Sequence, residues 1–208
     1  MNPLEKLHDR HHHQRRLRVL GRCLAELIPT GARVLDVGCG DGLLTSFLAR
    51  SRPDLQLVGV DVLVREGAHV PVDRFDGRTL PYPDGSFDAA LCVDVVHHAE
   101  DPEALLAEAA RVARHWVVLK DHLLAGVLAG PTLRFMDRVS NRRHGIEIPC
   151  HYWERERWRQ AFAHLGLAVE AWNGRLGLYP WWARPHVERG LHFAARLGRG
   201  GRDAAAPA

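Results

Sequence analysis

The stretch VLDVGCGDG at residues 34–42 decides how this chain folds. Its first four residues are apolar except for Asp36, which is typical of a buried strand. Three glycines at alternate positions then let the backbone turn sharply before the helix predicted over 43–50. A strand, a glycine turn and a helix in this order indicate a parallel sheet, whose ligands bind at the carboxyl ends of its strands.

The glycine turn suits a nucleoside that carries positive charge rather than phosphates. A dinucleotide site needs G-x-G-x-x-G, but Leu43 stands where the third glycine would be. No Gly-Lys-Ser/Thr follows the turn, which excludes a P-loop. The carboxylate of Asp36 would repel a pyrophosphate and attract an ammonium group.

The rest of the chain alternates apolar strand patterns with amphipathic helix patterns, which predicts an α/β fold with one parallel sheet covered on both faces. We expect a single domain over residues 1–197, with an N-terminal helical segment (1–30) and a disordered tail (198–208). The predicted strands cover 33–37, 55–61, 70–75, 87–93, 115–120, 167–172 and 191–197, and the main helices 4–27, 43–50, 101–114 and 154–164.

Composition narrows the class of protein. The 208 residues are 46% hydrophobic and 25% charged, and the net charge of +3 is too balanced to indicate nucleic-acid binding by itself. No apolar run approaches the ~20 residues of a membrane span. The four cysteines form no CxxC pair and the N-terminus has no signal pattern, so we expect a cytoplasmic protein without a disulfide framework. We interpret the histidines at 11–13 as native surface.

Two more acids follow predicted strands. Asp61 ends the second strand, where a carboxylate can accept hydrogen bonds from both ribose hydroxyls. Asp76 ends the third strand beside Gly77, where it could accept a hydrogen bond from an adenine amine.

The sequence resembles the class I S-adenosylmethionine-dependent methyltransferases, especially the subgroup similar to ubiquinone/menaquinone-biosynthesis methyltransferases (methyltransferase type 11). The resemblance covers residues 32–120 and rests on 36–42, VGVD at 58–61, FDG at 75–77, LPYPDGSFD at 80–88 and VVHH at 95–98. It implies a Rossmann-like seven-stranded sheet, mostly parallel with an antiparallel last strand. It also implies S-adenosyl-L-methionine as cofactor and S-adenosyl-L-homocysteine as product.

The resemblance assigns cofactor contacts to residues around the turn and the strand ends. The methionine moiety would be held near the glycine turn and by the acid after the fourth strand, the ribose by the second-strand acid, and the base by the third-strand acid and its neighbours. The residues implied are Asp36, Gly38, Gly40, Asp61, Val62, Asp76, Gly77 and Asp94.

The methyl acceptor should lie near the ends of the fourth and fifth strands. His122 could act as a general base that Asp121 orients, with His98 as another catalytic candidate. Lys120 could pair with Asp121 or with an anionic acceptor, although a solvated strand end would explain these residues equally well. The candidate acceptor-binding residues are Lys120, His97, Arg138, Arg142, His151 and Tyr152.

We interpret residues 122–152 as a lid-like insertion. Its basic cluster, which includes Arg134, Arg138 and Arg142, is either a solvated helix face or a site for an anionic group of the acceptor. No His/Asp set has convincing metal-ligand spacing, so we expect no metal.

The sequence therefore predicts methyl transfer to a small-molecule or lipid-like acceptor at oxygen, nitrogen or carbon, by a monomer or homodimer. Two alternatives stay open. The chain could methylate RNA or protein through the basic lid, or bind S-adenosylmethionine without catalysis. The Asn/Asp-Pro-Pro-Tyr motif of amino-group nucleic-acid methyltransferases and a catalytic Pro-Cys pair are both absent, which argues against a nucleic-acid acceptor.

Overall fold

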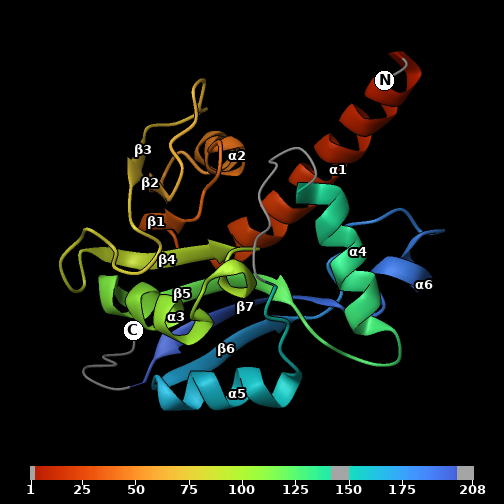
Figure 1. The fold of residues 1–208 in the computed structure, drawn as a ribbon. Coiled ribbons are helices and arrows are strands. Elements are labelled where there is room, and N and C mark those ends of the chain that lie inside the picture. Colours follow the sequence, from red (N-terminus) through yellow and green to blue (C-terminus); the bar gives the residue numbers. More distant parts are fainter. Residues whose placement is uncertain (1–2, 142–149, 201–208) are drawn as a thin grey trace.

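A central sheet organises the chain (Figure 1). The computed structural model describes residues 3–141 and 150–200, and within them seven strands pair in the order β3-β2-β1-β4-β5-β7-β6. The strands are β1 (Arg33–Val37), β2 (Gln56–Asp61), β3 (Val72–Arg74), β4 (Phe87–Val93), β5 (Ala113–His122), β6 (Leu167–Asn173) and β7 (His192–Arg199).

The strand directions confirm the predicted Rossmann-like arrangement. β1 pairs in parallel with β2 and β4, and the outer neighbours β3 and β5 continue the same direction. β7 lies between β5 and β6 and runs antiparallel to both. The carboxyl ends of β1 to β5 therefore meet at one edge of the sheet, where parallel α/β folds bind their ligands.

Helices cover both faces of the sheet. They are α1 (Pro3–Leu27), α2 (Leu43–Ser51), α3 (Pro102–Val112), α4 (Ala129–Asn141), α5 (Arg155–His164) and α6 (Arg184–Val187), with a short 3₁₀ turn, η1 (Val96–His98). Side chains alternate across the sheet, so Val34 packs in the core beneath α1 and α2, whereas Leu35 packs in the core beneath α3 and α5. The α3 helix begins where predicted, because the Asp101 carboxylate accepts hydrogen bonds from the backbone N–H groups of Glu103 and Ala104.

Two strands end two residues later than the sequence predicts. β5 continues through Asp121 to His122, because β7 pairs with it along the whole stretch from Trp116 to His122. β7 likewise continues through Gly198 to Arg199, so these residues belong to the sheet and not to a tail. Residues 201–208 of the predicted tail lie outside the described residues. In the described part of the chain, no helix is long and apolar enough to cross a membrane.

Candidate functional site

The glycine turn after β1 has the conformation that its sequence demands. Gly38, Gly40 and Gly42 all adopt positive φ angles of 71°, 64° and 72°. A Cβ on Gly38 would lie only 2.3 Å from Cγ2 of Val95, which follows β4. A Cβ on Gly40 would meet no described atom within 4 Å. Gly38 is therefore required by packing as well as by backbone angle, and Gly40 leaves its backbone open to a ligand.

Two acids stabilise this turn. The Asp61 carboxylate, at the end of β2, accepts hydrogen bonds from the backbone N–H of Gly40 (2.8 Å) and of Leu63 (2.9 Å). Asp36 is 2% exposed and accepts a hydrogen bond from the Thr45 hydroxyl at 2.6 Å. Burial raises the pKa of Asp36 to about 7. Cofactor binding at this turn is thus expected to depend on two carboxylates in unlike environments.

The residues expected around the adenine lie together at the neighbouring strand end. Val62, Arg74, Phe75 and Asp76 line an open hollow. A Cβ on Gly77 would lie 3.3 Å from a methyl group of Val62, so this glycine also borders the hollow. The structure therefore brings Val62, Asp76 and Gly77 together beside Asp61, as the resemblance implies for a base-binding site.

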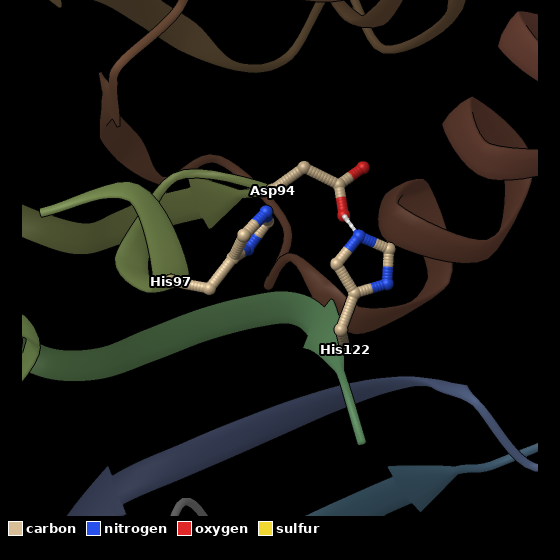
Figure 2. A group of neighbouring side chains, drawn as sticks. All are labelled: Asp94, His97 and His122. Atoms are coloured by element: carbon tan, nitrogen blue, oxygen red, sulfur yellow. Dashed lines mark ion pairs between the residues drawn. The ribbon is translucent and has the colours of Figure 1, made fainter. Parts of the chain in front are cut away.

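A second group of polar side chains lies at the carboxyl ends of β4 and β5. Figure 2 shows three of them, with the ring of His122 facing the carboxylate of Asp94 and His97 beside both. We call the whole group the polar cluster. It comes from β4, η1, β5, α4, β7 and the segment before α5, and consists of Asp94, His97, Lys120, Asp121, His122, Asp137, Tyr152 and His192.

His97 is oriented by Asp121. The Nδ1 atom of His97 lies 2.6 Å from Oδ1 of Asp121, and both side chains are almost fully buried. Burial opposes a charged imidazole, but the Asp121 carboxylate outweighs it and raises the pKa of His97 to about 10. Among the described residues, Nε2 of His97 and Oδ2 of Asp121 have no hydrogen-bond partner. The sequence-based pairing of Asp121 with the ring of His122 is wrong, because strand alternation turns Asp121 toward η1.

His122 is oriented by His192 instead. These residues are cross-strand partners on β5 and β7, and their Nδ1 atoms lie 3.0 Å apart. Nε2 of His192 lies 3.1 Å from the carbonyl oxygen of Val187, which can only accept a hydrogen bond. His192 therefore carries its proton on Nε2, and its Nδ1 accepts from the Nδ1–H of His122. Burial and the nearby Lys120 charge keep the pKa of His192 well below its usual value, consistent with a neutral ring.

Asp94 and Lys120 form a buried ion pair. Lys120 is fully buried and its ammonium group contacts Oδ1 of Asp94, whose Oδ2 accepts a hydrogen bond from Arg16 of α1 at 3.0 Å. Burial opposes the ionised carboxylate, but the Lys120 charge holds the pKa of Asp94 well below its usual range. Lys120 therefore pairs with Asp94 and not with Asp121, and its burial removes it from direct contact with an anionic acceptor. Asp94, expected at the methionyl end, has both oxygens held by these cations.

The helix α4 brings an additional acid over the cluster, and Figure 1 shows this helix next to the carboxyl end of β5. Oδ1 of Asp137 lies 3.5 Å from Nε2 of His122, and Oδ2 of Asp137 lies 3.6 Å from Nε2 of His97. The Tyr152 hydroxyl donates a hydrogen bond to Asp137. Tyr152, a candidate acceptor-binding residue from the sequence, thus belongs to the cluster.

Two further candidates, His98 and His151, border the cluster. The ring of His98 packs on that of His97, with centroids 3.9 Å apart. His151 contacts the cluster only through its backbone N–H, which donates to the carbonyl of His97, and its side chain is exposed. Arg138 is exposed on α4, and Arg142 lies outside the described residues.

Comparison with known proteins agrees with this geometry. A family model described as "Methyltransferase domain" matches residues 9–171, which is most of the chain. The chain belongs to the class I S-adenosylmethionine-dependent methyltransferases.

Curated relatives of this methyltransferase match parts of it. A ubiquinone biosynthesis O-methyltransferase of Xanthomonas axonopodis pv. citri is 35% identical over 102 residues, covering 43% of this chain and 42% of that protein. The 27-O-demethylrifamycin SV methyltransferase of Amycolatopsis mediterranei is 31% identical over 124 residues, covering 51% and 45%. The chain therefore spans less than half the length of these relatives.

The fold is also similar to that of solved structures. The YcgJ protein from Bacillus subtilis superposes with a TM-score of 0.63 at 21% identity, covering 93% of this chain and 100% of that one. At this identity the likeness concerns the fold alone.

Sequence analysis of the methyltransferase missed three residues of this site, namely Asp137, His192 and Arg16. Asp137 lies four residues after Leu133, which is fully buried, so helical spacing places both on the face of α4 that packs on the domain. That spacing could have identified Asp137 from the sequence. No comparable pattern marks His192 or Arg16, whose roles depend on the β5–β7 register and on the position of α1.

Proposed function

We propose that this chain transfers the methyl group of S-adenosylmethionine to an oxygen atom of a small-molecule or lipid-like acceptor. The observation that carries the proposal is the direct contact between the glycine turn and the segment that bears the polar cluster. Val95 packs against Gly38, and its neighbours along the chain, Asp94 and His97, belong to the cluster. A cofactor in the turn would thus lie next to buried groups suited to an acceptor.

The cofactor half of the proposal rests on the carboxylates and the open backbone. Each Asp61 oxygen accepts one backbone hydrogen bond and has a second lone pair for a ribose hydroxyl. Asp36 lies beneath the turn, where a neighbouring sulfonium or ammonium charge would favour its ionised form. The hollow beside Asp76 suits a planar base.

The acceptor half rests on the polar cluster. Methyl transfer is an in-line displacement in which the acceptor oxygen bonds to the methyl carbon while the carbon–sulfur bond breaks and its electron pair stays on sulfur. The hydroxyl proton must leave, and the imidazole of His122 is a nearby group that can assist its loss, whereas His97, with its pKa raised to about 10, keeps its proton at neutral pH. The names of the relatives from Xanthomonas and Amycolatopsis specify methyl transfer to oxygen, which supports this choice of atom.

Calorimetric titration tests the cofactor half. We expect S-adenosylmethionine and S-adenosylhomocysteine to bind the wild type, and Asp61→Ala to weaken both by about 1–3 kcal/mol, roughly 10- to 100-fold. Asp84→Ala is the matched control, because that acid is 81% exposed and its ion pair is with Arg111, outside the cofactor site. Absence of binding to correctly folded wild-type protein would contradict the proposal.

A labelled methyl donor tests the acceptor half. We expect label from S-adenosylmethionine to appear in a small molecule of a cell extract, as an ether or ester that acid or base hydrolysis identifies. Label in RNA or protein would support the macromolecular alternative. Cofactor binding without transfer to any fraction would support a non-catalytic binding protein.

A further inference from the structure

We propose that Asp94, His97, His122 and Asp137 form a binding site for one divalent transition-metal ion. One ligand atom from each of Asp94, His97 and His122 lies within 4.8 Å of the others, as Figure 2 shows for these side chains. A second, overlapping set contains His97, His98 and Asp137. The two sets share His97, and Asp137 approaches both imidazoles from α4.

The distances between the imidazole nitrogens and the carboxylate oxygens are closer to those between ligands of one metal ion than to those of hydrogen bonds. Nε2 of His122 lies 3.7 Å from Asp94 and 3.5 Å from Asp137, and Nε2 of His97 lies 3.6 Å from Asp137. Good hydrogen bonds between such atoms measure about 2.7–3.2 Å. Ligands bound at about 2.0–2.2 Å in a tetrahedron are separated by about 3.3–3.6 Å. Each of these three pairs is thus spaced to share an ion, and the pairs are linked because His122 and Asp137 each belong to two of them.

The hydrogen bonds at the Nδ1 atoms of His97 and His122 also orient both rings toward the proposed site. Asp121 accepts from Nδ1 of His97, and His192 accepts from Nδ1 of His122, so the Nε2 atoms of both rings face Asp137. Metal-bound histidines commonly donate their other N–H to a carboxylate or a similar acceptor, which fixes ring orientation. Nε2 of His97 is buried and has no hydrogen-bond partner among the described residues, so the protein alone leaves it unsatisfied.

The charge of the site favours a cation. Three carboxylates, Asp94, Asp121 and Asp137, face two fixed positive charges, Lys120 and Arg16. An ion that binds Nε2 of His97 displaces the proton from that atom. With both imidazoles neutral the cluster then carries a net charge of −1, and the ion together with one anionic oxygen leaves it neutral. The donor set of two imidazoles and two carboxylates suits Zn²⁺, Fe²⁺, Co²⁺ or Mn²⁺, whereas Mg²⁺ and Ca²⁺ prefer oxygen ligands alone.

The catalytic role of the ion rests on the proposed function, whereas the binding of the ion does not depend on it. Bound beside the glycine turn, a metal ion would hold the acceptor oxygen and lower the pKa of its hydroxyl group. Because Nε2 of His122 would be bound to the ion, the hydroxyl proton would pass to solvent and not to this ring. The resulting oxygen anion would attack the methyl carbon while sulfur keeps the electron pair. The anionic oxygen would also complete the charge balance.

Cobalt titration tests the site, because tetrahedral Co²⁺ bound to protein absorbs visible light. The histidines at 11–13 can bind metal themselves, so the parent protein carries glutamine at these three positions. After removal of metal with EDTA, we expect this parent to bind one Co²⁺ per chain with a saturating visible band that Zn²⁺ abolishes. No saturable binding of either ion would overturn the proposal.

Matched variants assign the ligands. His97→Gln and Asp137→Asn should each lower Co²⁺ affinity at least tenfold, whereas His151→Gln, which alters a neighbouring exposed side chain, should leave it unchanged. Zn²⁺ should raise the melting temperature of the parent but not that of Asp137→Asn, which also verifies that the variant folds. Equal metal affinity in all variants would contradict the site. Titration of S-adenosylmethionine into the metal-free parent separates the proposals: intact cofactor binding without metal binding would overturn only the metal site.

Discussion

The two halves of the site are encoded in different ways. The glycine turn and Asp36 come from seven consecutive residues, 36–42, at the end of β1 and before α2, and Asp61 reaches the turn from the adjacent strand. The polar cluster takes its side chains from positions between 94 and 192, on six different segments. The turn therefore depends on local backbone conformation, whereas the cluster depends on the packing of the whole domain. Substitutions that separate local from long-range contributions should affect the two halves unequally.

The largest effect is expected where the core supports the polar cluster. Trp158 is 1% exposed, packs edge-on against Phe193, and donates its indole N–H to the carbonyl of His122 at 3.1 Å. We expect Trp158→Ala to lower the free energy of unfolding by about 3–5 kcal/mol and to disturb the cluster, because it empties a large buried volume. Urea denaturation measures the loss. Trp181→Ala, at an 80% exposed position, should change stability by no more than about 0.5 kcal/mol.

Cofactor affinity of the folded Trp158→Ala protein should stay close to that of the wild type, since Trp158 does not contact the glycine turn. A parallel loss of cofactor affinity would show that the two halves are not independent.

The next effect concerns the contact between the two halves. Gly38→Ala should lower the free energy of unfolding by about 1–2 kcal/mol because of the left-handed backbone, and by about 1–3 kcal/mol more because of the clash with Val95. Gly31→Ala is the matched control, because Gly31 has nearly the same φ of 72° and a Cβ there would meet nothing within 4 Å of the described atoms. Thermal unfolding of both variants should show the larger loss for Gly38→Ala. Equal losses would refute a tight contact at Val95.

A pH-dependent effect isolates the acid beneath the glycine turn. The pKa of Asp36 is raised by burial from 3.8 to about 7 in the folded protein. Its contribution to stability is therefore fully present below about pH 4 and is lost as the pH rises through 7, by at most about 1.4 kcal/mol per pKa unit. The Asp36→Asn variant lacks this titration. The unfolding free energy of the variant should therefore rise relative to that of the wild type between pH 5 and pH 8. Urea denaturation of both proteins across this range measures the difference. If the two curves of unfolding free energy against pH run parallel, the raised pKa of Asp36 is contradicted.

The smallest effect should leave both halves intact. Asp101→Ala removes the N-terminal cap of α3 and should lower stability by about 1 kcal/mol. Asp101→Asn keeps a capping oxygen and should remain within a few tenths of a kcal/mol of the wild type. Calorimetric titration should give unchanged cofactor affinity for both, and a change in Asp101→Ala would indicate that α3 positions the site.

Much of the fold and of the cofactor half could be predicted from the sequence, because their determinants are local. β1 and β4 begin and end at the predicted residues, and Asp101 caps α3 as expected. Alternate glycines between a strand and a helix permit few backbone conformations, so the residue types at 38–42 are enough to indicate the turn. The acids Asp61 and Asp76 follow strands whose carboxyl ends share one edge.

Only the tertiary structure decided the polar cluster. Strand alternation turns Asp121 toward His97 and His122 toward the opposite face, and the β5–β7 register then places His192 beside His122. The fold of α4 over the sheet edge brings Asp137 to both imidazoles. The expectation of a metal-free protein rested on ligand spacing along the chain, whereas the metal site proposed above takes its candidate ligands from separate segments. Side chains far apart in sequence meet only when the burial of two hydrophobic cores fixes the sheet register and the helix positions, and that is a property of the whole domain.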